Sequence, residues 1–297
     1  MQNAREIGRE FEGCFSIPHD NPPRWLFVLT AYLDESGQES TDYVFIAGFL
    51  GNDEQWKRCA DDWRIGLGKR KGLHMKKLRW AYPKKIEKLL ARLGPIPHNC
   101  GLKPLLGGVR VSDYQDLVGG DIRKKVMAGY MAALYPLVIQ MLKVVPCDER
   151  VEIVFEAQDQ YQASVNIMLS NLVKCDPQFL TADGSPKLAN WKFVPKDSTL
   201  LTQPADYFAY AVTQIYRDEH SEKTKLCMPI CPDGPKSTAI GAVMTRHQVR
   251  GIVQLTHNLA TLQALSGVNL HPRTSEEREQ FNAMVREFIS GRPHETE

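Results

Sequence analysis

The stretch that decides the fold runs from Trp25 to Leu50 and reads WLFVLTAYLD-ESGQES-TDYVFIAGFL. An apolar run from Trp25 to Asp34 is followed by the polar segment 35–40, which contains Gly37. A second apolar run then extends from Asp42 to Leu50. Both runs are rich in β-branched and aromatic residues, and the polar segment is typical of a turn. We therefore predict two antiparallel strands that form a hairpin.

Downstream of this hairpin, strand-like and helix-like segments alternate. Strands are predicted at Leu105–Val111, Val151–Glu156 and Asn190–Val194, and helices at Asp121–Val145, Tyr161–Val173 and Pro204–Tyr216. A hairpin followed by alternating helices and strands is typical of a mixed sheet with helices on its faces. The predicted fold class is therefore α/β, with a five-stranded mixed sheet flanked by helices.

The predicted domain covers residues 25–217, with a helical insertion at about 52–95. Asn52 followed by Gln55 predicts a capping box at the start of the insertion. Residues 1–24 are expected to form an N-terminal arm that ends at a pair of prolines. Residues 218–297 are expected to form a loop and a helical C-terminal extension, with helices at about Val249–Leu265 and Ser275–Ile289.

Composition excludes several broad classes of protein. The 297 residues are 43% hydrophobic and 24% charged, which is close to the globular average and argues against wholesale disorder. The segment Val126–Val145 is long enough to span a bilayer, but Pro136 and Lys143 interrupt it, and its apolar residues recur at helical spacing. We expect a buried helix and no membrane partner. Seven scattered cysteines and a charged N-terminus predict reduced thiols in a cytoplasmic protein without a secretory signal.

Carboxylates end two of the predicted strands. Asp34 and Glu35 close the first strand, and Glu156 closes the fourth. A buried carboxylate is costly unless it is paired or bound to a metal ion. Alternation along the strand places Asp34 on the face of Tyr32, while Glu35 points to the other face or into the turn. Asp159 is the alternative to Glu156, although a helix N-cap also explains an aspartate there.

A third carboxylate begins a late helix, in the sequence Gln203-Pro204-Ala205-Asp206. Pro204 fits a first helical turn, and the helix dipole favours an anion such as Asp206 in that turn. Gln203 and Asp206 are three residues apart and can share one face of the helix. Taken alone, these residues are also explained by helix stability.

The segment Lys69–Lys88 is strongly basic. It contains nine basic residues against one acid, Glu87, so its net charge of +8 exceeds the +2 of the whole chain. Aromatic residues are interleaved with the cations, a pattern that suits phosphate contacts combined with base stacking. A solvated helix face is the alternative, and His74 is otherwise a structural histidine. The predicted nucleic-acid contacts are Lys69, Arg70, Lys71, His74, Lys76, Lys77, Arg79 and Trp80.

Several well-known catalytic motifs are missing from the sequence. It contains no P-loop, no dinucleotide-binding G-x-G-x-x-G, no G-x-S-x-G elbow and no H-E-x-x-H. Kinase, dehydrogenase, serine hydrolase and zinc protease activities therefore lack support.

Three stretches of the sequence together resemble a known family. The Asp34-Glu35-Ser36-Gly37 strand end, the Phe45-Ile46-Ala47-Gly48 strand and the Gln203-x-x-Asp206 helix resemble the bacterial and phage family catalogued as domain of unknown function 3800. That family is similar to the ribonuclease H-like, or retroviral integrase-like, fold. The resemblance covers about residues 25–217.

The resemblance implies a catalytic acid on the first strand, at the end of the fourth strand and on the last helix. These positions fall on Asp34, Glu156 and Asp206, which would bind two Mg²⁺ or Mn²⁺ ions about 3.5–4 Å apart. The implied function is a divalent-metal-dependent phosphodiester hydrolase, a nuclease, that acts on DNA or RNA. Glu35 would be an auxiliary ligand or hold the turn, and Gln203 would orient water or a ligand.

One departure from the pattern keeps the ligand set open. The fourth strand ends in Glu156 where many such sites have aspartate, so Asp159 remains the alternative ligand. A non-catalytic nucleic-acid-binding or phage-defence interaction module with the same fold is the alternative function, and a phosphatase of small substrates is a third.

Overall fold

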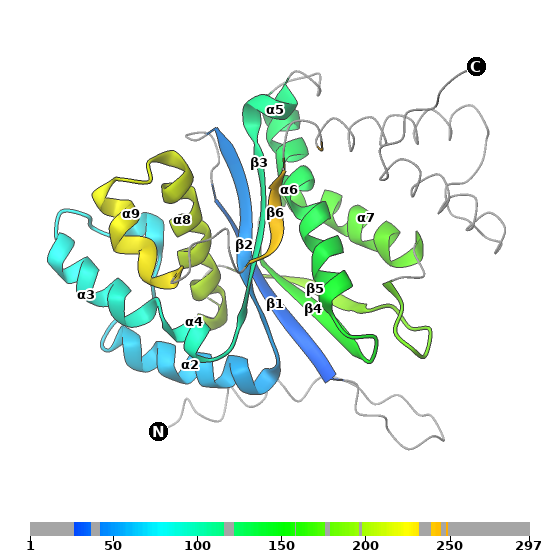
Figure 1. Ribbon diagram of the computed structural model, residues 1–297, viewed down its shortest axis with the longest axis horizontal. Helices are drawn as coiled ribbons and strands as arrows, with labels where there is room; N and C mark the ends of the chain where they lie inside the picture. Colours follow the sequence, from blue (N-terminus) through cyan, green and yellow to red (C-terminus); the bar gives the residue numbers. More distant parts are fainter. Residues whose placement is uncertain are drawn as a thin grey trace.

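The computed structural model of the chain describes residues 27–36, 42–115, 122–157, 159–175, 179–195, 198–231, 239–244 and 248. These residues form a mixed sheet with helices on both faces, which confirms the predicted α/β class (Figure 1). The strand order is β5-β4-β1-β2-β3-β6. The strands are β1 (Phe27–Ser36), β2 (Tyr43–Gly51), β3 (Lys103–Arg110), β4 (Glu149–Glu156), β5 (Leu188–Val194) and β6 (Ile240–Met244).

The predicted hairpin lies at the centre of this sheet. β1 and β2 pair antiparallel, and Leu33 lies opposite Gly48. A Cβ atom at Gly48 would lie 1.8 Å from the carbonyl oxygen of Tyr32, so only glycine allows the two strands to approach this closely. β1 extends two residues beyond its predicted end, because Glu35 and Ser36 still pair with β2. The predicted turn residues 37–40 lie outside the described ranges.

The remaining strand pairs give β1 a parallel neighbour on its other side. β1 pairs parallel with β4, and β4 pairs parallel with β5. β2 pairs antiparallel with β3. The carboxyl ends of β1, β4 and β5 therefore lie at one edge of the sheet, where the predicted carboxylates of the first and fourth strands are found.

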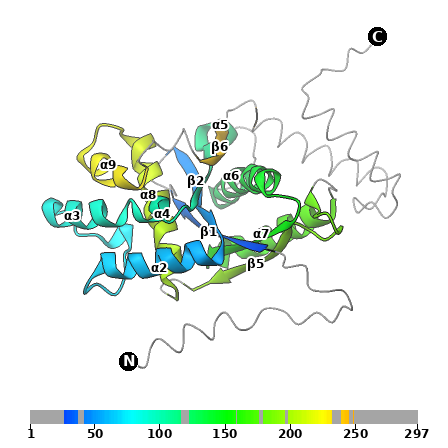
Figure 2. The ribbon, with the colours of Figure 1, turned by 60° about the horizontal axis from the view of Figure 1, so that its bottom comes forward.

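Helices cover the two faces of the sheet in separate layers (Figures 1 and 2). One layer contains α6 (Ile122–Val144) and α7 (Asp159–Cys175), and the other contains α2 (Asp53–Leu67), α3 (Pro83–Leu93), α8 (Gln203–Arg217) and α9 (Glu222–Cys227). The side chains of β1 point alternately to the two faces of the sheet and pack in two different buried clusters. Tyr32 packs in the cluster beneath α8, whereas Leu33 packs in the cluster beneath α6. Each face of the sheet therefore has its own hydrophobic core.

The insertion between β2 and β3 is partly helical. It contains α2, the 3-10 turn η1 (Met75–Lys77), α3 and the short α4 (Ile96–Asn99). The predicted capping box is confirmed, since the Asn52 side chain accepts from the Gln55 amide and the Gln55 side chain accepts from the Asn52 amide. Residues 69–74 and 78–82 connect the helices without regular structure. The short elements α5 (Val111–Gln115), η3 (Leu200–Thr202) and η4 (Met228–Ile230) complete the described helices.

The prediction of five strands is one too few, because the described residues form a sheet of six strands. β6 pairs parallel with β3 and lies in the segment that was predicted to be loop and helix. β6 has five residues and includes Gly241, so it lacks the long apolar run that signals a strand. The predicted arm at 1–24 and the predicted helices at Val249–Leu265 and Ser275–Ile289 lie outside the described residues.

The apolar segment Val126–Val145 forms most of α6. Its residues Leu134, Leu137 and Met141 are buried against the sheet, as the helical spacing predicts. Within the described part of the chain, no helix is both long and apolar enough to cross a membrane.

Candidate active site

Three consecutive polar residues are buried at the end of β1. Asp34, Glu35 and Ser36 are 6%, 7% and 5% exposed. One carboxylate oxygen of Asp34 accepts a hydrogen bond from the Glu35 amide at 2.9 Å. Because Tyr32 packs beneath α8, alternation places Asp34 on the α8 face of the sheet and Glu35 on the α6 face. The sequence predicts this division.

The environment of Tyr130 on α6 agrees with this orientation. The pKa of its phenol is raised well above the ordinary value, first by burial and then by the negative charges of Glu35 and Asp34. Tyr130 also stacks on Tyr161 of α7, with ring centroids 4.0 Å apart. A neutral phenol beneath the end of β1 therefore shares its surroundings with the two carboxylates.

Glu156 ends β4 on the same face as Asp34. In the parallel pair, Leu33 aligns with Phe155, so the next residues on the two strands are Asp34 and Glu156. Val154 packs in the same cluster as Tyr32, which assigns Glu156 to the α8 face by alternation. Glu156 is 7% exposed. The alternative, Asp159, is the first residue of α7, and its side chain lies outside the described part of the structure.

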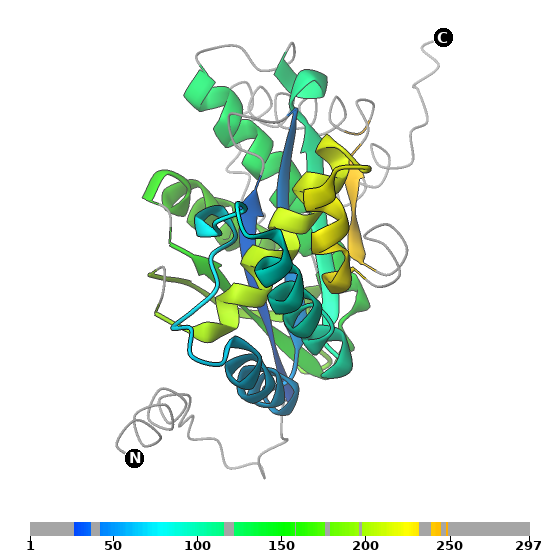
Figure 3. The same ribbon diagram turned by 90° about the vertical axis from the view of Figure 1, so that its left-hand side faces the viewer.

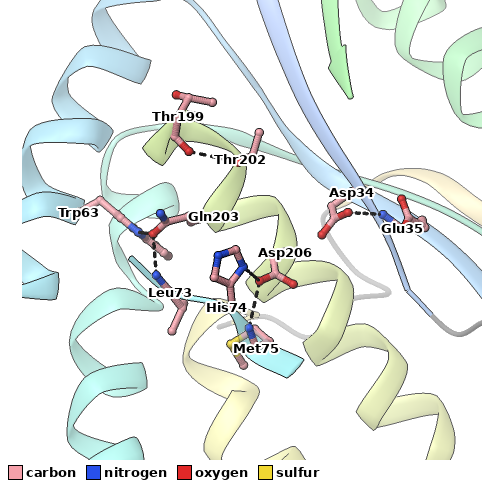
Figure 4. A network of polar contacts seen from close by, with 10 residues as sticks. All are labelled: Asp34, Glu35, Trp63, Leu73, His74, Met75, Thr199, Thr202, Gln203 and Asp206. Carbon is pink, nitrogen blue, oxygen red and sulfur yellow. Dashed lines mark hydrogen bonds and ion pairs between the residues drawn. The ribbon is translucent and has the colours of Figure 1, made fainter. Parts of the chain in front are cut away.

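Asp206 lies in the first turn of α8, and the basic segment wraps over it. One carboxylate oxygen accepts a hydrogen bond from the Met75 amide at 3.0 Å and lies 3.8 Å from Nδ1 of His74 (Figure 4). These contacts fix Asp206 and place His74 beside it. The sequence predicts both residues as functional but gives no sign that they contact each other.

Gln203 holds the other side of the same loop. Its side-chain oxygen accepts hydrogen bonds from Nε1 of Trp63 at 3.1 Å and from the Leu73 amide at 2.9 Å (Figure 4). A Cβ atom at Gly72 would lie 2.8 Å from its side-chain nitrogen, so the loop passes very close to Gln203. These contacts join α2, α8 and the basic segment. That Gln203 also orients water or a ligand stays a prediction.

A small cavity lies where these elements meet. Its volume is about 150 Å³, and it is lined by Asp34, Glu35 and Ser36 from β1, by Asp206 and Tyr210 from α8, and by His74, Lys76 and Lys77 from the insertion. The structure therefore brings two predicted acids of separate elements into one cavity with three predicted nucleic-acid contacts. Glu156 and Gln203 are not among its lining residues.

Sequence reasoning missed two of the cavity residues, Ser36 and Tyr210. Tyr210 follows Asp206 by four residues on one helix, a spacing that places both side chains on one face and could have identified it. Burial, followed by the nearby Cys227, raises the pKa of Tyr210 to about 12. Its phenol therefore stays protonated at neutral pH and can donate a hydrogen bond.

The predicted cations of the basic segment are all on the surface. The side chains of Lys69, Arg70, Lys71, Lys76, Lys77, Arg79, Lys84, Lys85 and Lys88 are exposed. Trp80 differs, because its ring is half-buried and stacks on Tyr210, with centroids 5.8 Å apart. The ammonium of Lys223 lies 5.6 Å from the same ring. That Trp80 stacks on bases stays a prediction, and its contacts in the structure are those of a packed side chain.

Comparison with known proteins adds no relative. Searches with family models, against curated proteins and against solved structures find no match to this chain.

Proposed function

We propose that this protein is a divalent-metal-dependent phosphodiester hydrolase, a nuclease that acts on nucleic acid. The observation that carries the proposal is the composition of one cavity, in which Asp34 and Asp206 lie together with Lys76 and Lys77. Carboxylates attract a divalent cation, and lysines attract a phosphate. A metal-bound phosphodiester is a ligand that needs both kinds of side chain at one place.

We also propose that the fold is ribonuclease H-like and that the chain is related to the domain of unknown function 3800 family. The resemblance implies a fixed order of elements, which is a hairpin, a third strand and then alternating helices and strands. The elements from β1 to β5 follow this order. The positions of Asp34 on β1 and Asp206 on α8 further support the proposal, because the resemblance assigns catalytic acids to the first strand and the last helix.

The donor atoms of the cavity fit Mg²⁺ or Mn²⁺. Both ions prefer oxygen ligands, and Mg²⁺ keeps several waters while bound by one or two carboxylates. Asp34 and Asp206 would supply these carboxylates, and Glu156 would supply a further one from the same face of the sheet. A bound ion would polarise the phosphodiester and lower the pKa of a coordinated water.

The remaining residues of the cavity have roles that their contacts suggest. The Met75 amide and His74 hold Asp206 in place. Lys76 and Lys77 are exposed and would contact the nonbridging oxygens of the phosphate. The protonated Tyr210 would donate a hydrogen bond to a phosphate or a water.

The non-catalytic alternative has one observation in its favour. Among the described residues, no group of three or more histidine, cysteine, aspartate or glutamate side chains is placed to hold a metal ion. A nucleic-acid-binding module with the same fold would keep the exposed lysines and need no such group. Measurement of cleavage separates the two functions.

The test is cleavage of labelled single-stranded and double-stranded DNA, RNA and hybrid by the purified chain with Mg²⁺, Mn²⁺ or EDTA. We expect cleavage with the metal ions, and we expect Asp34→Asn and Asp206→Asn to reduce it to the level seen with EDTA. Asp61→Asn is the matched control, because Asp61 is exposed on α2, where it forms a surface ion pair with Arg64, and does not line the cavity. Equal cleavage by the unaltered chain and by all three variants would contradict the proposed site. Binding of nucleic acid without cleavage would favour the non-catalytic module.

A further inference from the structure

Two aromatic rings in the basic segment have very different surroundings. Trp80 is half-buried between Tyr210 and Lys223, so protein atoms already contact its ring. Tyr82, two residues later, is 55% exposed. The sequence alone cannot distinguish these two rings. In the structure, Tyr82 is the one that presents a large surface to solvent.

The backbone of Tyr82 is held on both sides. Its amide donates to the Arg79 carbonyl at 3.1 Å, and its own carbonyl accepts from the amides of Lys85 and Ile86 at the start of α3. The ring is therefore attached to a fixed point at the beginning of a helix. A ring in such a position loses little conformational entropy when a ligand stacks on it.

Tyr82 is surrounded in sequence by cations that are all exposed. The ammonium of Lys85 lies 5.4 Å from its ring centroid, and Arg79 and Lys84 are close neighbours along the chain. Lys77, which lines the cavity, is five residues away, a separation of at most about 18 Å even for extended chain. One strand of a few nucleotides can therefore contact both the cavity and Tyr82.

We propose that Tyr82 is a stacking platform for an unpaired base and that the substrate is single-stranded nucleic acid. This inference deepens the proposed function and rests on it. A base in a duplex is covered by its neighbours on both faces, so only an unpaired or extruded base can lie on an aromatic ring. Exposed lysines beside an exposed ring supply the phosphate contacts that accompany such stacking.

An anionic membrane is the other partner that attracts lysines and aromatic rings. The structure favours nucleic acid, because the basic surface continues into a cavity that also contains two carboxylates, those of Asp34 and Asp206. Carboxylates of this kind can bind the metal ion of a phosphodiester, whereas an anionic bilayer repels them. Vesicles serve as the competing ligand in the test.

The test is fluorescence anisotropy of the full chain with a labelled 12-nucleotide single strand and with its duplex, in EDTA so that no cleavage occurs. We expect the single strand to bind more tightly, and Tyr82→Ala to weaken its binding by about 5- to 150-fold, the effect of losing one stacked base. Tyr82→Phe keeps the ring and should bind within about twofold of the unaltered chain. Ile167→Ala is the matched control, since Ile167 is 65% exposed on α7 and lies on the other face of the sheet.

Three results would overturn the inference. These are equal binding of strand and duplex, unchanged binding by Tyr82→Ala, or displacement of the strand by phosphatidylserine vesicles. Hydrolysis of bis(p-nitrophenyl) phosphate by the unaltered chain and by Tyr82→Ala tests the proposed function separately, because this small phosphodiester has no nucleotide strand that must extend from the cavity to Tyr82. Strand binding that depends on Tyr82 without such hydrolysis would support the platform and contradict the hydrolase.

Discussion

At the scale of single residues, the burial of Asp34 carries a cost to folding that a bound metal ion would offset. Asp34 is buried and lines the same cavity as the carboxylate of Asp206, and without a cation the two negative charges repel each other. We therefore expect Asp34→Asn to leave the melting temperature of the metal-free protein unchanged or higher. The increase in melting temperature caused by Mn²⁺ should disappear in the same variant, because a ligand stabilises only the state that binds it.

Calorimetry with and without Mn²⁺ measures both effects. Asp61→Asn on the surface of α2 is the control, and it should keep the full Mn²⁺ response. Undiminished Mn²⁺ affinity in Asp34→Asn would remove Asp34 from the proposed ligands and favour the non-catalytic module.

The residue scale also shows what the sequence can and cannot predict about the site. The alternation of side chains along β1 is enough to assign Asp34 and Glu35 to opposite faces, because Tyr32 and Leu33, the residues before them, lie in the same regular strand. The surroundings of Trp80 depend on Tyr210, a residue far away in the chain. No local pattern shows that the exposed ring of the segment is Tyr82.

At the scale of elements, a buried lysine caps the C-terminus of α6. Nζ of Lys187, which is 7% exposed, donates to the carbonyls of Val145 at 2.7 Å and Leu142 at 3.3 Å. A cation at a helix C-terminus interacts favourably with the helix dipole and satisfies carbonyls that have no partner within the helix. We expect Lys187→Met to lower the free energy of unfolding by about 1–3 kcal/mol, because it leaves these carbonyls without their donor.

Urea unfolding of the variant checks this value. Lys143→Met is the matched control, because Lys143 lies in the last turn of the same helix but is exposed. If Lys187→Met and Lys143→Met lost the same stability, the hydrogen bonds of Lys187 to the end of α6 would contribute nothing beyond the loss of a positive charge.

Elements with strong local signals are the ones that the sequence predicts correctly. The hairpin and the α2 cap depend on apolar runs, a polar turn and one Asn–Gln pair within a few residues. β6 has five residues and pairs with β3, which is more than a hundred residues earlier in the chain. Its stability comes from that distant pairing and not from its own composition, so its existence could not be predicted locally.

At the scale of the whole molecule, charge is distributed very unevenly. The chain carries a net charge of +2, while Lys69–Lys88 alone carries +8, so the rest of the molecule is acidic on balance. The fold places this segment over the N-terminal turn of α8 (Figure 3). His74, Lys76 and Lys77 of the segment line the same cavity as Asp34 and Asp206. A polyanion that approaches the protein is therefore attracted to the face that contains the candidate site.

This asymmetry predicts how binding depends on salt. Each lysine or arginine that contacts a phosphate releases about 0.7 to 0.9 counterions from nucleic acid. Neutralising Lys76, Lys77 and Arg79 together should lower the slope of log affinity against log salt by roughly two to three units. It should also weaken binding to all sequences about equally, because phosphate contacts carry no base information.

Fluorescence anisotropy across a salt series measures this slope. Asp34→Asn should leave it nearly unchanged, since that substitution adds no contact between a cation and the strand, and Tyr82→Ala should lower affinity with little change in slope, because stacking releases few ions. The two kinds of variant thus separate electrostatic from stacking contributions on one surface. An unchanged slope in the triple variant would mean that the segment is a solvated surface, and the nucleic-acid proposal would then rest on the carboxylates and the fold alone.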